Sequence, residues 1–360
     1  MCEEKKIFNI EDVDRNLVVS TTVTEPDLVW YNVRKDPFAV HGLLYDEEMG
    51  HFLRIPQSVA DTVSEGVAGG LNRQTAGGRV RFKTNSRFIA IHAVMVNTKP
   101  MSHMPLTGQS GFDLYHTVEG REIYYKTFVP RRGMTEGYDS GHAVDGALCD
   151  YTINFPLYDN VKELYVGLKK DALIEAAAPY RYTTPIVYYG NSVTQGGCAS
   201  RPGNSYQAIL SRRLSADHIN LGYSGSGKGE PQFAEYIATL PMSVFVMDYD
   251  HNAPTPEALL ETHEPFYRIV REKNPTLPIV MISSSGVLLK PYLSRRRDII
   301  RETYQHVLAA GDKNVYFVDG AEIFEGVDWD ACTVDGSHPN DLGFFRYADC
   351  LEKYLRPLLS

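Results

Sequence analysis

The sequence PIVYYGNSVTQGG, residues 185–197, indicates the fold of this chain more directly than any other part. Its β-branched and aromatic residues 186–189 predict a buried strand, and Gly190 permits a tight turn that carries Ser192. In a parallel α/β sheet ligands bind at the carboxyl edge of the strands, which is where this turn would place Ser192. A serine after a strand can equally cap a helix, so the rest of the chain has to distinguish the two roles.

From residue 185 onward, strand patterns alternate with helical patterns. The alternation predicts a parallel, doubly wound, flavodoxin-like sheet with right-handed crossovers, an α/β fold. The expected strands are 186–189, 218–221, 244–248, 278–283 and 315–319. A last helix is expected over 341–355, and helical spacing predicts that it buries Leu342, Phe345, Leu351 and Leu355.

The first half of the chain has a different pattern of apolar and polar residues. Alternating apolar and polar residues with Gly, Asn and Pro turns predict an antiparallel, jelly-roll-like β-sandwich, in which residues 57–64 are the one expected helix. The expected strands are 28–31, 80–82, 88–94, 112–115, 123–125, 150–153 and 164–168. Because the pattern changes near Pro179, we expect two domains, a sandwich over 1–178 and an α/β domain over 179–360.

Charge and composition exclude several classes of function. The chain of 360 residues carries a formal charge of -9, which argues against nucleic acid as a partner. It contains no apolar segment of the roughly 18 residues that a membrane-spanning helix needs. The five cysteines form neither a disulfide framework nor a metal-binding pair, although a bridge between Cys198 and Cys332 stays open.

The amino terminus leaves the location of the protein open. Residues 1–6, MCEEKK, lack the apolar core of a signal peptide. We expect a cytoplasmic protein or, if a signal has been removed, a secreted or periplasmic one in which Cys2 is a possible lipid-attachment residue. The sequence does not fix the oligomeric state.

Polar groups follow the second and third expected strands as well. Residues 222–228, GYSGSGK, nearly match the phosphate-binding GxxxxGK loop, but Gly229 stands where that motif has Ser or Thr, which disfavours nucleotide binding. After the third strand, Asp248 and Asp250 are expected to form structural hydrogen bonds at the strand end. Asn252 carries an uncharged N–H donor, which suits a developing oxyanion.

The motif Asp335-x-x-His338 follows the fifth expected strand. Alone it is a weak signal, since such an Asp often accepts backbone N–H groups in a turn. Here the loop can bring an imidazole to Ser192 while Asp335 holds the other ring nitrogen. The groups therefore supply a nucleophile, a base and an orienting carboxylate at one sheet edge.

Together these motifs resemble the four blocks of the SGNH hydrolase family, also called GDSL esterases. The resemblance covers the chain from residue 185 to its end, and GFDLY at 111–115 is similar to the GxDLY-type amino-terminal domain of one bacterial subgroup. The matching blocks are Gly190-Asn191-Ser192, Asn220-x-Gly222-x-x-Gly225, Asn252 and Asp335-x-x-His338.

The resemblance implies a catalytic triad and an oxyanion hole, with neither a metal nor an organic cofactor. The triad would be Ser192, Asp335 and His338, and the oxyanion would be bound by the backbone N–H groups of Ser192 and Gly225 and by the Asn252 side chain. Two departures are Asn191 in place of the family's Asp, and DHNA at 250–253 in place of Gly-x-Asn-Asp.

The expected activity is that of a serine esterase that cleaves short acyl esters, acetyl esters of carbohydrates above all, through an acyl-serine. Tyr223 and Tyr249 near the catalytic loops are possible sugar contacts, and no long amphipathic lid typical of lipases lies between the blocks. Two alternatives stay open. The chain is either a short-chain esterase, lipase-like enzyme or thioesterase for other substrates, or a carbohydrate-binding protein that has lost catalysis.

Overall fold

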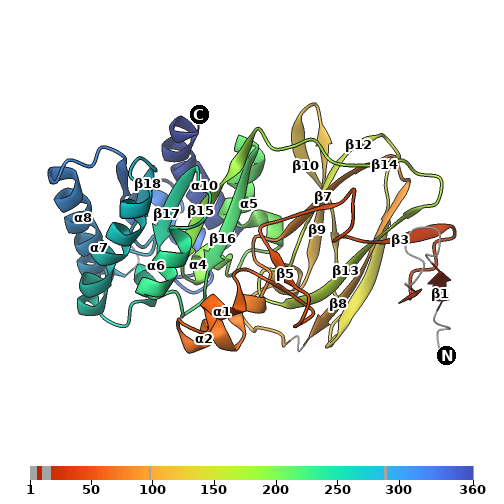
Figure 1. Cartoon of the computed structure of the whole chain (residues 1–360), viewed down its shortest axis with the longest axis horizontal. Coiled ribbons are helices and arrows are strands. Elements are labelled where there is room, and N and C mark those ends of the chain that lie inside the picture. Colours follow the sequence, from red (N-terminus) through yellow and green to blue (C-terminus); the bar gives the residue numbers. More distant parts are fainter. Residues whose placement is uncertain (1–5, 10–17, 97–98, 288–289, 360) are drawn as a thin grey trace.

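The computed structural model describes residues 6–9, 18–96, 99–287 and 290–359. Two layered parts lie end to end along the long axis of the molecule, a β-sandwich built from the first half of the chain and an α/β part built from the second half (Figure 1). Cys2 and the segment around it lie outside the described residues. Among the helices of the described residues, none has both the length and the apolar character that crossing a membrane requires.

The first half forms two antiparallel sheets that face each other. One has the order β10-β9-β12-β7-β14 with β4 also on β7, and the other has the order β11-β8-β13-β3. Their bounds are β3 Leu28–Asn32, β4 Ala39–His41, β7 Arg79–Thr84, β8 Phe88–Val96, β9 Phe112–Val118, β10 Arg121–Phe128, β11 Gly137–Ala143, β12 Cys149–Asn154, β13 Asn160–Lys169 and β14 Ile174–Glu175.

Smaller elements flank the sandwich. Two short antiparallel pairs, three short α-helices and a 3-10 turn at Leu71–Arg73 complete the described part of this half. The helix expected over 57–64 ends already at Ala60, and a second short helix begins at Glu65. Their bounds are β1 Lys6–Asn9, β2 Val18–Thr21, β5 Leu44–Asp46, β6 His51–Leu53, α1 Gln57–Ala60, α2 Glu65–Gly69 and α3 Leu106–Gln109.

Alternation of side chains along the strands builds the sandwich core. Ile89, Ile91 and Ala93 of β8 point inward and pack in one cluster with Phe82 of β7 and Leu114 of β9. Every second residue of a strand faces the same side, so this alternation places one apolar face of each sheet against the other. The predicted antiparallel sandwich is confirmed. Strand β11 was missed, because two glycines and several polar residues hide its pattern.

The second half is built on a parallel sheet. In the part of the chain that the structure describes, it has five strands in the order β16-β15-β17-β18-β19. Counted along the chain this is the order 2-1-3-4-5 of flavodoxin-like folds, as predicted. The bounds are β15 Tyr182–Gly190, β16 Ala216–Gly222, β17 Val244–Asp248, β18 Ile279–Ile282 and β19 Val315–Val318.

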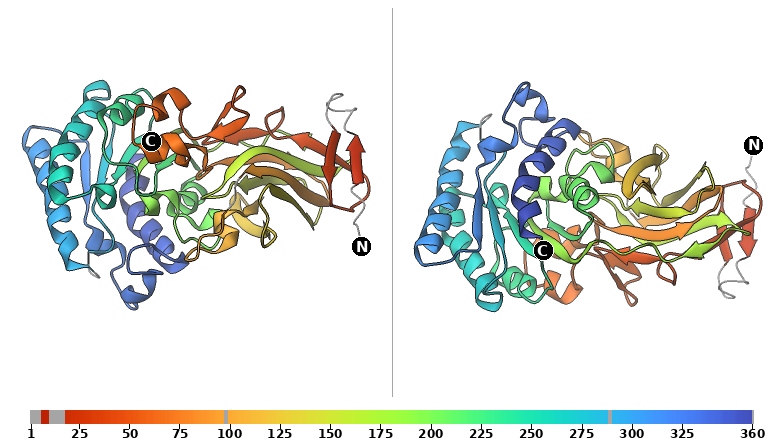
Figure 2. Two further views of the ribbon diagram at one scale, coloured as in Figure 1. Left: turned by 90° about the horizontal axis from the view of Figure 1, so that it is seen from below. Right: turned by 90° about the horizontal axis from the view of Figure 1, so that it is seen from above.

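Helices cover both faces of this sheet (Figure 2). Ile186 and Tyr188 of β15 pack with α5, α9 and α10, whereas Val187 and Tyr189 pack with α6, α7 and α8. The sheet is therefore doubly wound and buried on both sides. The helices are α4 Ser192–Gln195, α5 Tyr206–Leu214, α6 Pro231–Ile237, α7 Pro256–Lys273, α8 Ser294–Ala309, α9 Gly320–Ile323 and α10 Asp341–Leu355.

Helix α10 has the predicted bounds, but its buried stripe differs from the prediction. Leu342 and Phe345 are 42% and 41% exposed, while Phe344 and Tyr347 are buried together with the correctly predicted Leu351. The ring of Tyr347 stacks on Tyr206 of α5 with centres 4.4 Å apart. The error arose because Tyr347 was not counted as a core residue. Its polar hydroxyl can be buried because it donates a hydrogen bond to Asp248.

The two halves are tied by a short connection and by an ion pair. Strand β14 ends at Glu175 and β15 begins at Tyr182, and on this basis we propose the domain boundary near residue 178. Across the junction, Arg79 of β7 pairs with Asp217 and donates to the His218 carbonyl at 3.1 Å. These contacts fix the sandwich against β16.

Asp248, at the carboxyl end of β17, is buried beneath the turn that carries Ser192. Its Oδ2 accepts hydrogen bonds from Tyr347 at 2.7 Å and from Thr194 at 3.1 Å. Burial, and then the negative charge of Asp250, raise the pKa of Asp248 to about 8 despite these hydroxyl donors. The folded protein therefore holds a proton here that an exposed aspartate loses near its ordinary pKa of 3.8.

We predict that Asp248 makes stability depend on pH. Between about pH 4 and pH 8 the folded state binds the proton and the unfolded state does not, so the free energy of unfolding falls as pH rises through this window. Asp248→Asn cannot ionise, and its Tm should fall less between pH 5 and pH 8 than that of the wild type. Calorimetry at a series of pH values measures this. If the Tm of the two proteins changed by the same amount between pH 5 and pH 8, Asp248 would not be the group responsible.

Candidate active site

Ser192 occupies the first position of helix α4, directly after strand β15. Asn191 caps this helix: its Oδ1 accepts the Val193 N–H at 2.7 Å, and its Nδ2 donates to the Asp248 carbonyl at 2.8 Å. The second bond needs an N–H donor, so an aspartate at position 191 could not form it. The Ser192 side chain is half-buried, and its own N–H belongs to the first turn, whose N–H groups have no partner within the helix.

Two glycines allow the segments around Ser192 to pack closely. A Cβ atom at Gly190 would lie 2.1 Å from Thr194 Oγ1 and 2.3 Å from the Asp248 carbonyl oxygen. A Cβ atom at Gly222 would lie 2.2 Å from the Gln195 backbone nitrogen. These distances are too short for any side chain, so both positions require glycine.

The structure joins Ser192, His338 and Asp335 in one hydrogen-bonded path. Ser192 Oγ lies 2.9 Å from His338 Nε2, and His338 Nδ1 lies 2.7 Å from Asp335 Oδ2. Because a carboxylate only accepts, Nδ1 carries the proton of the neutral ring and the lone pair of Nε2 faces the serine hydroxyl. The imidazole is thus oriented to take the Ser192 proton.

Asp335 is held as a carboxylate although its side chain is 40% exposed. Its Oδ1 accepts the backbone N–H groups of Ser337 at 2.9 Å and His338 at 2.8 Å. Partial burial alone would raise the pKa of Asp335, but hydrogen bonds from the His338 backbone, the His338 ring and the Ser337 backbone hold it well below its usual range. The aspartate is therefore charged near neutral pH and can stabilise an imidazolium.

Asn252 and Gly225 lie beside each other, but their N–H groups already have hydrogen-bond acceptors: Gly225 donates to Asn252, and Asn252 donates to carbonyls of the loop after β16. Asn252 Oδ1 accepts the Gly225 N–H at 3.1 Å, and Asn252 Nδ2 donates to the carbonyls of Tyr223 at 2.8 Å and Gly227 at 3.0 Å. A side-chain amide has two N–H hydrogens, and both have acceptors here. An oxyanion that binds to Asn252 has to replace one of these carbonyls.

Asn220 connects the same loop to the nucleophile helix. Its Nδ2 donates to the Thr194 carbonyl at 2.8 Å, and its Oδ1 accepts the Gly222 N–H at 2.9 Å. The Gln195 side chain adds a second link, since its Oε1 accepts the Ser224 N–H at 3.0 Å. The two segments that flank the serine are therefore held in a fixed relation.

Residues of the sandwich half also support the site, and the sequence analysis missed them. Arg54 is fully buried, donates to the Gly222 carbonyl and lies 3.9 Å from the centre of the Tyr223 ring. The Tyr158 hydroxyl donates to the Ser192 carbonyl at 3.1 Å. The one signal in the sequence was a lone arginine in the apolar run FLRI at 52–55, a pattern typical of a buried cation.

Two groups of residues have roles other than binding. Asp250 Oδ2 accepts the Ser284 N–H at 2.9 Å, the structural role that was expected of this aspartate. His251 Nε2 contacts the Ser284 hydroxyl and serves local structure as well. The expectation that Tyr223 and Tyr249 contact sugar is wrong. Both side chains are buried, 0% and 1% exposed, because they pack under the sheet edge with Arg54 and aromatic neighbours.

The bridge between Cys198 and Cys332 is not formed in the structure. Both are buried, free thiols. Cys332 Sγ lies near the Asp328 carbonyl, whereas Cys198 lies beside His338. Burial, and then the charge of Asp335, raise the pKa of Cys198 to about 11, so it is a neutral thiol and a poor competitor to Ser192 as nucleophile.

Comparison with known families matches both halves of the chain. Residues 183–356 match the GDSL-like Lipase/Acylhydrolase family, and residues 28–174 match the GxDLY family, the N-terminus of SGNH-hydrolase-type esterases. A comparison with curated protein sequences found no match.

Solved structures share the whole architecture. A Bacteroides ovatus protein described as a GDSL-like lipase is 28% identical with a TM-score of 0.82, over 92% of this chain and 98% of its own. A salicylyl acyltransferase from a tetracycline biosynthetic pathway is 20% identical with a TM-score of 0.74, over 93% and 98%. An acetyl xylan esterase from Butyrivibrio proteoclasticus is 14% identical with a TM-score of 0.53, over 92% and 98%.

We predict that Ser192→Ala lowers kcat on a small ester by about 10⁴-fold or more while leaving Tm within a few degrees of the wild type, because only the reacting hydroxyl is removed. Initial rates and calorimetry measure the two quantities. Peptide mapping after reaction with a serine-directed phosphonate should place the label on Ser192. A label on Ser224 or Ser284 would show that the nucleophile lies elsewhere.

Asn252→Ala should lower kcat by about 10²- to 10³-fold with little change in KM, because one donor to the oxyanion is lost. Asn252→Asp is the matched variant: it keeps the acceptor for the Gly225 N–H but lacks both side-chain N–H donors, and should lose as much. Steady-state kinetics decides. A raised KM with an unchanged kcat would mean that Asn252 binds substrate and has no special role in the transition state.

Proposed function

Since the chain belongs to the GDSL-like lipase/acylhydrolase family, we propose that it is an esterase that removes short acyl groups, acetyl above all, from carbohydrates through an acyl-serine intermediate. The observation that carries the hydrolytic part is the hydrogen-bonded path from Ser192 through His338 to Asp335. This path lies at the carboxyl edge of a parallel sheet, where α/β folds bind their ligands.

Acylation begins when Ser192 Oγ attacks the ester carbonyl carbon. His338 Nε2 takes the hydroxyl proton as the new C–O bond forms, and Asp335 stabilises the resulting imidazolium across its 2.7 Å contact. The proton then passes from Nε2 to the departing alkoxide, so the sugar hydroxyl leaves neutral and the acyl group remains on Ser192. No step of this sequence calls for a metal or an organic cofactor.

Deacylation repeats the sequence with water in place of the serine. His338 removes a proton from water, the hydroxide attacks the acyl carbon, and the proton returns to Ser192 Oγ as the acid leaves. In both half-reactions the developing oxyanion needs N–H donors that are already in place. The Ser192 N–H at the start of α4 is one, and Gly225 and Asn252 contribute once substrate replaces their bonds within the loop.

The positive charge of the buried Arg54 guanidinium also helps to stabilise the developing oxyanion. It is buried against the Gly222 carbonyl and the Tyr223 ring, close to the loop that carries Gly225. A buried positive charge acts through a medium of low dielectric constant, so it favours the negative charge that forms on the substrate oxygen. Arg54 also positions Gly222 directly through its hydrogen bond.

Exposed aromatic side chains support a carbohydrate substrate. Tyr292 is 71% exposed and Trp329 is 38% exposed. Tyr292 follows Lys290 closely, and Lys290 Nζ donates to Ser337 Oγ at 2.5 Å, which places this segment against the catalytic loop. Aromatic rings that are open to solvent stack well on the C–H faces of sugars, a role that the buried Tyr223 and Tyr249 cannot perform.

The sandwich half contacts the segments that carry the proposed catalytic residues. Gln74 accepts a hydrogen bond from Gln195 at 2.5 Å, and Tyr158 and Arg54 contact the segments that carry Ser192 and Gly222. A chain shortened to the α/β half would lose these contacts, so its activity would not report on substrate binding alone. Experiments on substrate preference therefore need the full chain.

We predict that kcat/KM falls steadily from acetyl to long-chain esters of one alcohol, and that the protein releases acetate from acetylated oligosaccharides or polysaccharides. Tyr292→Ala and Trp329→Ala should each lower activity on the glycan by about fivefold, the contribution of a stacking ring being on the order of 1 kcal/mol, while sparing a chromogenic acetate. Phe345→Ala removes from α10 a ring that is about as exposed as Trp329, 41% against 38%, and is the matched control.

Three outcomes would contradict parts of this proposal. Preference for long acyl chains without acetate release from any glycan would favour a lipase-like enzyme. Cleavage of thioesters in place of oxygen esters would favour a thioesterase. Glycan binding without hydrolysis of any ester would mean that the chain is a binding protein that has lost catalysis.

A further inference from the structure

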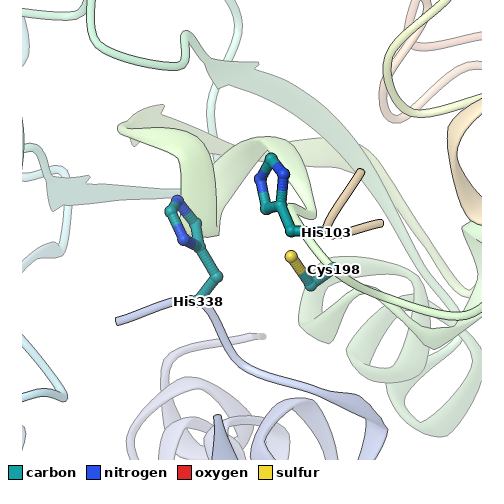
Figure 3. A group of neighbouring side chains, drawn as sticks. All are labelled: His103, Cys198 and His338. Carbon is teal, nitrogen blue, oxygen red and sulfur yellow. The ribbon is translucent and has the colours of Figure 1, made fainter. Parts of the chain in front are cut away.

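Three side chains of the types that bind transition metals in proteins, two histidines and a cysteine, lie together beside Ser192. One potential ligand atom each from His103, Cys198 and His338 lies within 4.8 Å of the other two, and the side chains face one another (Figure 3). The two imidazole rings have centres 5.7 Å apart. These residues come from the loop before α3, the turn after α4 and the catalytic loop, so the fold, and not local sequence, assembles them.

The atom that His338 can offer is the one that catalysis uses. Its Nδ1 is occupied by Asp335 at 2.7 Å, which leaves Nε2, the atom that contacts Ser192 Oγ at 2.9 Å. The Nε2 edge of the ring faces the Gly197–Cys198 segment, since a Cβ atom on Gly197 would lie 3.4 Å from His338 Cδ2. An ion between these residues therefore competes with Ser192 for the same lone pair.

Cys198 is held in an unusual backbone conformation. Its φ angle is +79°, the left-handed region that residues with a side chain rarely adopt, and the residue is only 3% exposed. Such outliers persist where the surrounding structure enforces them, and they concentrate at functional sites. The thiol that this conformation presents is free and has no disulfide role.

We propose that His103, Cys198 and His338 bind a thiophilic divalent ion such as Zn²⁺, and that the bound ion inhibits the esterase. A thiolate and two imidazoles are ligands that zinc prefers, with a fourth position left for water, whereas Mg²⁺ and Ca²⁺ prefer oxygen. On binding, the Cys198 thiol releases one proton to solvent and a metal–sulfur bond forms, with no change of oxidation state.

The required adjustment is small and falls on an exposed residue. Zinc bonds of about 2.3 Å to sulfur and about 2.0 Å to nitrogen set neighbouring ligand atoms roughly 3.3–3.6 Å apart in a tetrahedron. The three atoms, already within 4.8 Å, need to approach by about 1.5 Å at most. His103 is exposed on a surface loop and can supply that movement without disturbing the core.

The binding test does not depend on catalysis, whereas the inhibition rests on the proposed function. Isothermal titration of the full chain, and of Ser192→Ala, with Zn²⁺ should each give one site. Titration with Co²⁺ should add a thiolate-to-metal charge-transfer absorption. His103→Ala and Cys198→Ala should each weaken binding by at least about tenfold, since loss of outer partners of a metal ligand already costs 10–100-fold. His306→Ala and Cys149→Ser are matched controls that should bind as the wild type does.

Inhibition is then measured on a chromogenic acetate, each variant being compared with its own metal-free rate. Zn²⁺ should inhibit the wild type, EDTA should restore the rate, and Mg²⁺ should have no effect. His103→Ala and Cys198→Ala should need at least about tenfold more Zn²⁺ for the same inhibition. Equal Zn²⁺ affinity in both ligand variants and the wild type, or no binding at all, would overturn the proposal. A wild type that hydrolyses no ester would contradict the proposed function and leave the Zn²⁺ titration as the test of the site.

Discussion

The hydrogen bond of 2.9 Å between Ser192 Oγ and His338 Nε2 joins residues that lie 146 positions apart, and the proposed chemistry depends on it. Parallel strands bring all their carboxyl ends to one edge, so the turn after β15 and the loop before α10 meet there. At that edge the start of α4 fixes the serine, and Asp335 fixes the imidazole. The sheet order brings the two segments together, the Asn191 cap fixes the start of α4, and Asp335 orients the ring, so all three determine this one contact.

The sandwich contacts the candidate active site, although it supplies no member of the Ser–His–Asp path. Arg54 binds the Gly222 carbonyl, Tyr158 binds the Ser192 carbonyl, and Gln74 binds Gln195. Each contact places a sandwich side chain against a segment that carries or adjoins a candidate site residue. His103 reaches the same site from its surface loop and lies close enough to the catalytic imidazole to share a metal ion with it. The two halves therefore have to be considered together in any account of specificity.

Sequence patterns predicted the parts of this structure that local chemistry controls. All five parallel strands follow from apolar periodicity, and the doubly wound sheet follows from the alternation of strands with helices. Periodicity does not give the strand order, which was expected only as part of a flavodoxin-like fold. The motifs of Ser192 and His338 could be placed at one edge because every strand end leads there. Phe345 was assigned to the wrong face and Tyr223 was named as a possible sugar contact, because burial of an aromatic ring depends on its tertiary neighbours. Arg54 was missed for the same reason, since its partners lie in the other half of the chain.

The central claim is that the chain forms a covalent acyl-serine at Ser192, and trapping that species tests it most directly. The full-length protein is mixed with excess acetyl ester, quenched in acid within milliseconds to seconds, and digested for mass spectrometry. The account predicts one acetyl group on the peptide that contains Ser192, at a level that rises to a steady state during turnover and disappears when the ester is exhausted. An unmodified Ser192 peptide throughout active turnover, or an acetyl group on Cys198 in its place, would contradict the account.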